Sequence, residues 1–173
     1  MKRLQIEGYS DGACKPNPGP GGWGAVIMWS TEGAELRWLA HGGKKQTTNN
    51  EMELTGALEV LKLCPRGHDI TLYMDTQYFL KGVINGGLDG FVTKSKLGKG
   101  TIFTGWLNGW MAKGWTLGGG GKVKNLELWK AIVDECDSHI LNGSTLHFKW
   151  VKGHSGNEGN ELVDSLADLG IPK

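Results

Sequence analysis

The order of apolar patterns along this 173-residue chain predicts one α/β domain built on a mixed β-sheet. Three strand-like runs come first, and the short links between them favour antiparallel hairpins. Later strand-like runs alternate with segments of helical periodicity, and a helical crossover favours parallel neighbours in one sheet. The predicted order of elements is βββαβα(αα)βα. No repeat or linker divides residues 1–173, so we expect a single domain.

Five strands are expected from short runs of alternating or continuous apolar residues. Leu4, Ile6 and Gly8 alternate with polar residues in the first run, and a turn over residues 30–33 separates the second run from the third. The fourth run follows a helical segment, so we expect it to lie parallel to its neighbour in the sheet. The strands are predicted over residues 4–9, 24–29, 35–40, 70–74 and 146–151.

The helices are predicted from apolar residues three or four positions apart. Leu54, Leu58 and Leu61 have this spacing in the first long helix, which Pro65 ends. Trp106 and Trp110 are four positions apart and would share one face of a short helix. Further helices are predicted over residues 76–84, 125–138 and 158–169.

Composition and cysteine usage indicate an ordinary soluble domain. The chain is 39% hydrophobic and 21% charged, and no apolar run is long enough to span a bilayer. Its three cysteines, Cys14, Cys64 and Cys136, show no CxxC spacing. This pattern argues against a disulfide framework or a zinc site and fits a reducing compartment. We therefore expect a cytoplasmic protein without a membrane partner.

The formal net charge of +1 conceals a basic segment. Residues 90–130 carry seven lysines against one acid, whereas the remainder has twelve Lys and Arg against seventeen Asp and Glu. A basic segment on an acidic body favours contact with a polyanion, although a solvated surface is the alternative. The lysines are Lys94, Lys96, Lys99, Lys113, Lys122, Lys124 and Lys130.

The Gly- and Pro-rich stretch from Tyr9 to Val26 contains an acid, Asp11, that we place at the end of the first strand. Gly permits unusual backbone angles and Pro fixes its own, so we expect a shaped loop rather than a mobile one. Such a loop can bring backbone N–H groups and one carboxylate close to a ligand. A turn or capping role for Asp11 is the alternative.

Three further acids, Glu53, Asp75 and Asp164, lie at or near the edges of predicted elements, and each has a structural alternative. Glu53 has capping-box spacing from Asn50. Asp75 could cap the helix that follows the fourth strand. Asp164 lies in a polar helical stripe, where a solvated face is the default.

Parallel pairing of the first and fourth strands would bring three of these acids, Asp11, Glu53 and Asp75, into one region. Carboxylates gathered without Arg or Lys repel one another, and a divalent cation is the usual resolution. Oxygen ligands without Cys or His favour Mg²⁺ or Mn²⁺. Two such ions about 4 Å apart can hold the attacking water and the leaving oxygen of a phosphodiester.

Four segments of the chain closely resemble the signature segments of type 1 ribonuclease H, in the order found in that family: YSDGACKPNPGPGGWGAV, TTNNEMEL, YMDTQYF and VKGHSGNEGNELVDSLA. The resemblance implies a five-stranded mixed sheet, three strands antiparallel and two parallel, flanked by helices. It also implies cleavage of the RNA strand of RNA–DNA hybrids with two Mg²⁺ ions per site, Mn²⁺ being a substitute. The products would carry 5′-phosphate and 3′-hydroxyl ends.

The resemblance assigns roles residue by residue. Asp11, Glu53, Asp75 and Asp164 match the metal-binding carboxylates of the family. His154 matches its catalytic histidine, for which a solvated surface residue is the alternative. We expect a monomer with no obligate protein partner.

Further matches concern the substrate. Residues that match RNA-strand contacts, where the 2′-hydroxyl is tested, are Cys14, Asn49, Asn50 and Gln77. Asn17 and Thr48 match a phosphate pocket for the DNA strand. Within the Gly-rich segment 86–121, Trp106 and Trp110 match a handle that contacts the DNA backbone, with core packing as the alternative. A transposase-like nuclease of this fold and a module that only binds hybrids are the rival functions.

The chain departs from the family pattern in three places. Met111 and Ala112 stand where the handle is commonly basic, and Met28 and Ser30 occupy positions that are often Arg. An apparent insertion covers residues 86–105. Its three lysines, Lys94, Lys96 and Lys99, are expected to extend the contact of the handle with the DNA strand.

Overall fold

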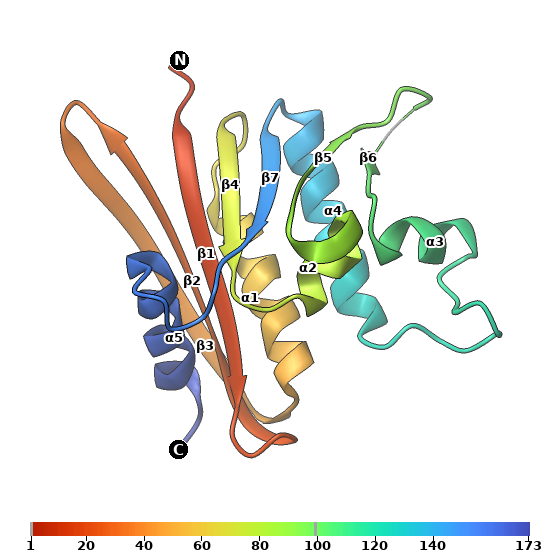
Figure 1. The fold of residues 1–173 in the computed structure, drawn as a ribbon, viewed down its shortest axis with the longest axis horizontal. Helices are drawn as coiled ribbons and strands as arrows, with labels where there is room; N and C mark the ends of the chain where they lie inside the picture. The colour runs from red at the N-terminus through yellow and green to blue at the C-terminus, as the bar shows by residue number, and fades with distance from the viewer. Residues whose placement is uncertain (1, 99) are drawn as a thin grey trace.

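One mixed sheet with helices on both faces forms the framework of the computed structural model, which describes residues 2–98 and 100–173 (Figure 1). Its strand order is β3-β2-β1-β4-β7-β5-β6. The strands are β1 (Gln5–Cys14), β2 (Gly19–Thr31), β3 (Ala34–Thr47), β4 (Asp69–Met74), β5 (Asp89–Lys94), β6 (Thr101–Ile102) and β7 (Thr145–Trp150). The helices are α1 (Asn49–Leu63), α2 (Tyr78–Val83), α3 (Trp106–Ala112), α4 (Leu126–Leu141) and α5 (Glu158–Gly170), with a 3₁₀ turn at Asn85–Gly87.

The centre of the sheet confirms the predicted pairing. β1 is antiparallel to β2 and parallel to β4, with Tyr9 opposite Tyr73. β4 is in turn parallel to β7. The carboxyl ends of β1 and β4 therefore lie at the same end of the sheet. All five predicted strands and the predicted helices are present.

The first hairpin is longer than the sequence predicts. Asp11 does not follow the first strand but lies within β1, opposite Gly24 of β2. The expected loop is reduced to a turn after Cys14, because the ladder between β1 and β2 continues through the glycines on both strands. Glycine weakens a strand but leaves its backbone N–H and C=O groups free to pair.

Two strands, β5 and β6, were not predicted from the sequence. β5 runs antiparallel to β7, with Asp89 opposite Lys149 and Val92 opposite Leu146. In the described part of the chain the sheet therefore has seven strands, five of them predicted and two from the inserted segment. Without β5, β7 would be an edge strand with unpaired backbone groups, and the insertion covers that edge.

The hydrophobic core is divided by the sheet. The larger part lies under α1, α2 and α4 and includes Leu54, Leu72, Trp129 and Phe148, all buried. On the other face, α5 covers a small cluster built on Tyr9, Val26 and Val163. None of the helices in the described ranges is both long enough and apolar enough to cross a membrane.

Candidate active site

Two helices approach β1 closely at Asp11, one on each face of the sheet. A Cβ atom on Gly12 would lie 2.4 Å from the backbone nitrogen of Glu53, so α1 can contact β1 here only because residue 12 has no side chain. A Cβ on Gly24, opposite Asp11, would lie 2.7 Å from the Cβ of Leu166 in α5. These approaches bring Glu53 and the turn of α5 that carries Asp164 to the level of Asp11.

The four predicted carboxylates interact in pairs. Asp11 is buried, accepts a hydrogen bond from the Gly12 N–H at 2.9 Å, and faces both Asp75 and Asp164. Glu53 faces Asp75 and accepts a hydrogen bond from the Thr76 hydroxyl at 2.8 Å. The structure therefore brings together Asp11, Glu53, Asp75 and Asp164, which we call the carboxylate cluster.

Burial and mutual repulsion perturb this cluster. Burial, followed by the negative charge of Asp75 and a hydrogen bond with Asp164, raises the pKa of Asp11 from 3.8 to about 8. Burial is also the main reason that the pKa of Glu53 rises from 4.5 to about 7, although the bond from Thr76 opposes the shift. Perturbed groups of this kind gather at functional sites more often than elsewhere.

The structural alternatives for these acids do not hold. The N-cap of α1 is Thr48, whose hydroxyl accepts from the Glu51 N–H at 3.1 Å, so Glu53 is not the capping partner of Asn50. Asp75 does not cap α2, because the N-cap position there belongs to Gln77. Asp164 is half-buried and its carboxyl acts electrostatically on that of Asp11, so it does not lie on a wholly solvated face.

The chemistry of the donor set fits a hard divalent cation. Across residues 2–98 and 100–173, no three His, Cys, Asp or Glu side chains are already gathered into one metal-binding arrangement. Mg²⁺, however, usually keeps several waters and takes only one or two protein carboxylates together with substrate phosphates. Pairs of carboxylates such as Asp11 with Asp75, and Asp11 with Asp164, are sufficient for that mode of binding.

His154 lies in the loop between β7 and α5 that borders the carboxylate cluster. Its side chain is exposed, and its φ of 53° is in the left-handed region. The adjacent Gly153 lies close to Asp75, since a Cβ there would lie 3.2 Å from the Asp75 Oδ2. The structure thus places His154 one residue from a contact with the cluster, on a solvent-accessible loop.

A polar cavity of about 460 Å³ lies at the start of α1. Its lining includes the predicted residues Asn17, Thr48 and Asn50, and also Lys124 and Asn125 from the segment before α4. Sequence reasoning missed Asn125, and it noted Lys124 only as part of the basic segment. Asn125 has a left-handed φ of 58°, a conformation that favours Asn and Gly and that is a weak signal in the sequence.

The remaining RNA-contact candidates differ in accessibility. Asn49 is half-buried beside this cavity, and its backbone N–H donates to the Asn17 Oδ1 at 3.1 Å. Gln77 is half-buried at the start of α2. Cys14 is buried, and its thiol lies within hydrogen-bonding distance of three carbonyl oxygens. Any contact of Cys14 with a ligand would therefore be made by its backbone.

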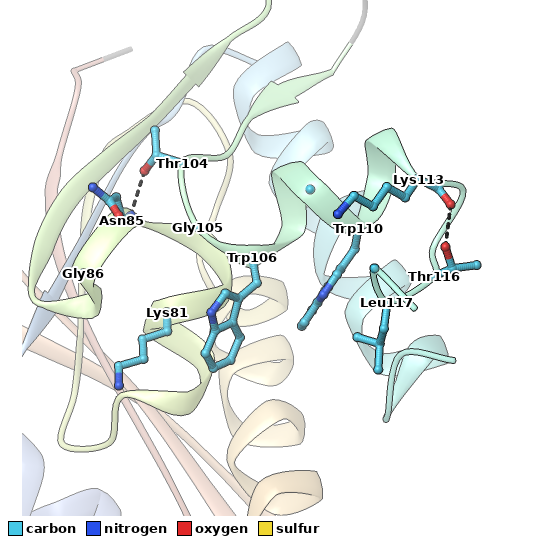
Figure 2. A pocket seen from close by; sticks show the side chains of 12 residues that line it. Lys81, Asn85, Gly86, Thr104, Gly105, Trp106, Trp110, Lys113, Thr116 and Leu117 are labelled. Atoms are coloured by element: carbon cyan, nitrogen blue, oxygen red, sulfur yellow. Dashed lines mark hydrogen bonds between the residues drawn. The ribbon is translucent and has the colours of Figure 1, made fainter. Parts of the chain in front are cut away.

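Trp106 and Trp110 line a cavity of about 570 Å³ between α2 and α3, together with Lys81 and Lys113. Figure 2 shows the two indole rings side by side, with the lysines on either side of them, and their ring centroids are 5.8 Å apart. Trp110 also packs edge-on against the buried Trp129, with centroids 5.4 Å apart. Trp110 thus joins the core to the cavity, whereas Trp106 is 41% exposed.

Two of the inserted lysines, Lys94 and Lys96, lie away from the carboxylate cluster and from the start of α1 (Figure 1). Lys94 lies past the start of β7. Asp75 follows the end of β4, which runs parallel to β7, so Lys94 and Asp75 lie at opposite ends of the sheet. Figure 1 shows the β5–β6 connection at the opposite end of the sheet from the start of α1. Lys94 instead borders a small apolar cavity with the last turn of α4. Lys96 lies in the same connection, and Lys99 lies outside the described residues.

Comparisons with known proteins give a consistent picture. The sequence model of the RNase H family matches residues 3–171. A ribonuclease H of Hahella chejuensis is 40% identical over 171 residues, which cover 99% of this chain and 95% of that protein. The solved structure of LC9-RNase H1, a type 1 RNase H with the type 2 active-site motif, matches with a TM-score of 0.73 at 22% identity, over 99% of this chain and 74% of that one. LC11-RNase H1, solved in complex with an RNA/DNA hybrid, matches with a TM-score of 0.57 at 20% identity, over 96% of both chains.

Proposed function

The chain belongs to the ribonuclease H family, and we propose that it hydrolyses the RNA strand of RNA–DNA hybrids with two Mg²⁺ ions, leaving 5′-phosphate and 3′-hydroxyl ends. The observation that carries the proposal is the carboxylate cluster. Four acids from β1, α1, the end of β4 and α5 face one another, and repulsion and burial keep two of them from ionising readily. A protein that only bound hybrids would gain nothing from such a costly arrangement.

The positions of these residues indicate a different role for each. Asp11, which interacts with both Asp75 and Asp164, would be the central ligand, and Glu53 would complete the set from α1. When bound, the ions would activate water and stabilise negative charge on the leaving oxygen. His154, on its exposed loop, would carry protons to or from the cleaved phosphodiester or assist product release.

Two cavities would extend the substrate surface beyond the cluster. The cavity with Asn17, Thr48 and Lys124 offers amide, hydroxyl and ammonium groups to a phosphate. The cavity with Trp106 and Lys113 offers an apolar wall and a cation to the sugar–phosphate backbone of the same DNA strand. LC11-RNase H1, a protein of this fold, was solved in complex with an RNA/DNA hybrid, which supports the choice of substrate.

Cleavage of strand-labelled duplexes tests the proposal. The protein is incubated with an RNA–DNA hybrid, double-stranded RNA and double-stranded DNA, each with Mg²⁺ and with EDTA. We expect cleavage of the RNA strand of the hybrid alone, only with Mg²⁺, and fragments that a ligase accepts through their 5′-phosphates. Hybrid binding without cleavage would make the protein a binding module, and cleavage of DNA would place it with the strand-transfer nucleases of this fold.

A further inference from the structure

Asn160, in the first turn of α5, is a buried polar residue whose hydrogen bonds are incomplete. Its side chain is only 2% exposed. The amide nitrogen Nδ2 donates to the Oδ2 of Asp75 at 3.4 Å, but the amide oxygen Oδ1 has no hydrogen-bond partner among the described residues. Buried polar atoms without partners are uncommon and call for an explanation.

A structural role in starting α5 does not explain the residue. The helix is capped by Asn157, whose Oδ1 accepts from the Asn160 backbone N–H at 2.9 Å. The side chain of Asn160 is therefore not used in the cap. The other buried side-chain atom without a partner in the described ranges, Nε1 of Trp129, lies among aromatic rings and touches no carboxylate.

The contact with Asp75 gives the side chain a different purpose. Asp75 faces Asp11 and Glu53, so repulsion favours rotation of its carboxylate away from both. The backbone of Asp75 is fixed by Trp150, whose Nε1 donates to its carbonyl oxygen at 3.0 Å, but this bond leaves the carboxylate free to turn. The Asn160 amide is the neighbour that donates to the carboxylate itself.

We propose that Asn160 is a positioning residue for Asp75: its Nδ2 holds the carboxylate toward the cluster, and its unpartnered Oδ1 accepts a hydrogen bond from a water of the hydrated divalent cation. The inference rests on the function proposed above. An amide suits both tasks because it carries a donor and an acceptor on one planar group. Outer residues that orient metal-binding carboxylates commonly change metal affinity when they are replaced.

The test uses Asn160→Leu, which keeps the approximate volume of the side chain and removes both polar groups. Its matched control is Asn157→Ala, three residues earlier, which removes the helix cap. Binding of Mg²⁺ alone to the substrate-free protein is measured by calorimetry, and the unfolding temperature is measured in EDTA. Asn160→Leu should weaken Mg²⁺ binding roughly tenfold to a hundredfold without lowering the unfolding temperature. Asn157→Ala should lower the unfolding temperature and leave Mg²⁺ affinity unchanged.

Wild-type Mg²⁺ affinity in Asn160→Leu would overturn the inference, and so would a loss of affinity that tracks a loss of stability. Should the leucine variant not fold, Asn160→Ala serves in its place; its unfolding temperature should fall because buried volume is lost, and its Mg²⁺ affinity, measured where it is fully folded, should drop by the same factor. Cleavage by the wild-type protein separates the two proposals. If the wild type cleaves hybrids with Mg²⁺ and the Asn160 variant keeps wild-type Mg²⁺ affinity, only the positioning role is contradicted. A wild-type protein that neither binds Mg²⁺ nor cleaves hybrids contradicts both proposals.

Discussion

The two ends of helix α1 meet polar clusters of opposite character. At its start lies the carboxylate cluster, where like charges face one another. Beyond its end lies an arginine cluster of Arg66, Glu135, His139 and Ser144. Arg66 donates to the Leu61 carbonyl at 3.0 Å and contacts both Glu135 and the His139 ring, whose Nδ1 lies 2.8 Å from the Ser144 hydroxyl.

The difference indicates what each cluster is for. In the arginine cluster the charges are opposite and the buried imidazole has partners at both ring nitrogens, so the arrangement contributes to stability. In the carboxylate cluster, burial and repulsion work against ionisation, and one neighbouring acceptor is unsatisfied. Replacements in the arginine cluster should therefore lower stability and spare activity. Replacements in the carboxylate cluster should lower activity and spare stability.

The largest effect is expected for Asp11→Asn. Loss of a central ligand should slow hybrid cleavage about a thousandfold or more, or about 4 kcal/mol in barrier height. Folding raises the Asp11 pKa from 3.8 to about 8, so the stability this group contributes is greatest below pH 3.8 and is lost as the pH rises to about 8. Asn does not ionise. At pH 8 in EDTA the variant should unfold at the same or a higher temperature than the wild type.

Asp168→Asn is the matched control, because Asp168 is an exposed acid on the same helix as Asp164 and forms an ion pair with Lys15 at 2.9 Å. It should change cleavage only a few-fold. Appreciable Mg²⁺-dependent cleavage by Asp11→Asn would remove the basis for a metal role of the cluster.

Next in size is the effect of Arg66→Ala on stability. The change leaves Glu135 without its cation and removes donors to two carbonyl groups, so the free energy of unfolding should fall by about 3 to 4 kcal/mol. Denaturant titration measures it. Arg3→Ala, which removes a more exposed guanidinium paired with Asp69, should cost about 1 kcal/mol or less. A tenfold drop in turnover of folded Arg66→Ala would contradict the division between the clusters.

The arginine cluster also predicts a pH dependence of opposite sign to that of Asp11. Burial, aided by the charge of Arg66, lowers the pKa of His139 from 6.5 to about 4. The unfolded chain takes up the proton first as the pH falls, so this contribution to stability is complete above pH 6.5 and is lost toward pH 4. The loss amounts to about 3 kcal/mol. Urea titrations between pH 4 and 7 should show a steeper loss for the wild type than for His139→Gln, and parallel curves would contradict the prediction.

The smallest effect is expected for His154→Ala. Because His154 is exposed and has no hydrogen bond to the cluster among the described residues, its loss should slow turnover about ten- to a hundredfold and leave Mg²⁺ affinity unchanged. Steady-state kinetics and calorimetry check the two parts. A variant as inactive as Asp11→Asn, with reduced Mg²⁺ affinity, would instead place His154 among the ligands.

Part of the carboxylate cluster could be predicted because Glu53 and Asp75 stand in local patterns that indicate a helix and a strand. Apolar periodicity placed Glu53 on a helix and Asp75 after a strand, and the crossover between them implied the parallel pairing of β1 and β4. What escaped prediction depends on distant partners. Arg66 meets Glu135 and His139 at separations of 69 and 73 residues, and β5 forms only because β7 offers an unpaired edge. The role of Asn160 depends on Asp75, 85 residues earlier.

The unfolding temperature at pH 8 with and without Mg²⁺, measured for the wild type, Asp11→Asn and Arg66→Ala, shows whether the carboxylate cluster binds the cation. A cation that binds the folded carboxylate cluster at ten times its Kd adds about 1.4 kcal/mol, or about 3 to 6 °C for a chain of this size. We predict this rise in the wild type and in the destabilised Arg66→Ala, and none in Asp11→Asn. An equal rise in Asp11→Asn would show that the cation binds elsewhere and that the carboxylate cluster is not the metal site.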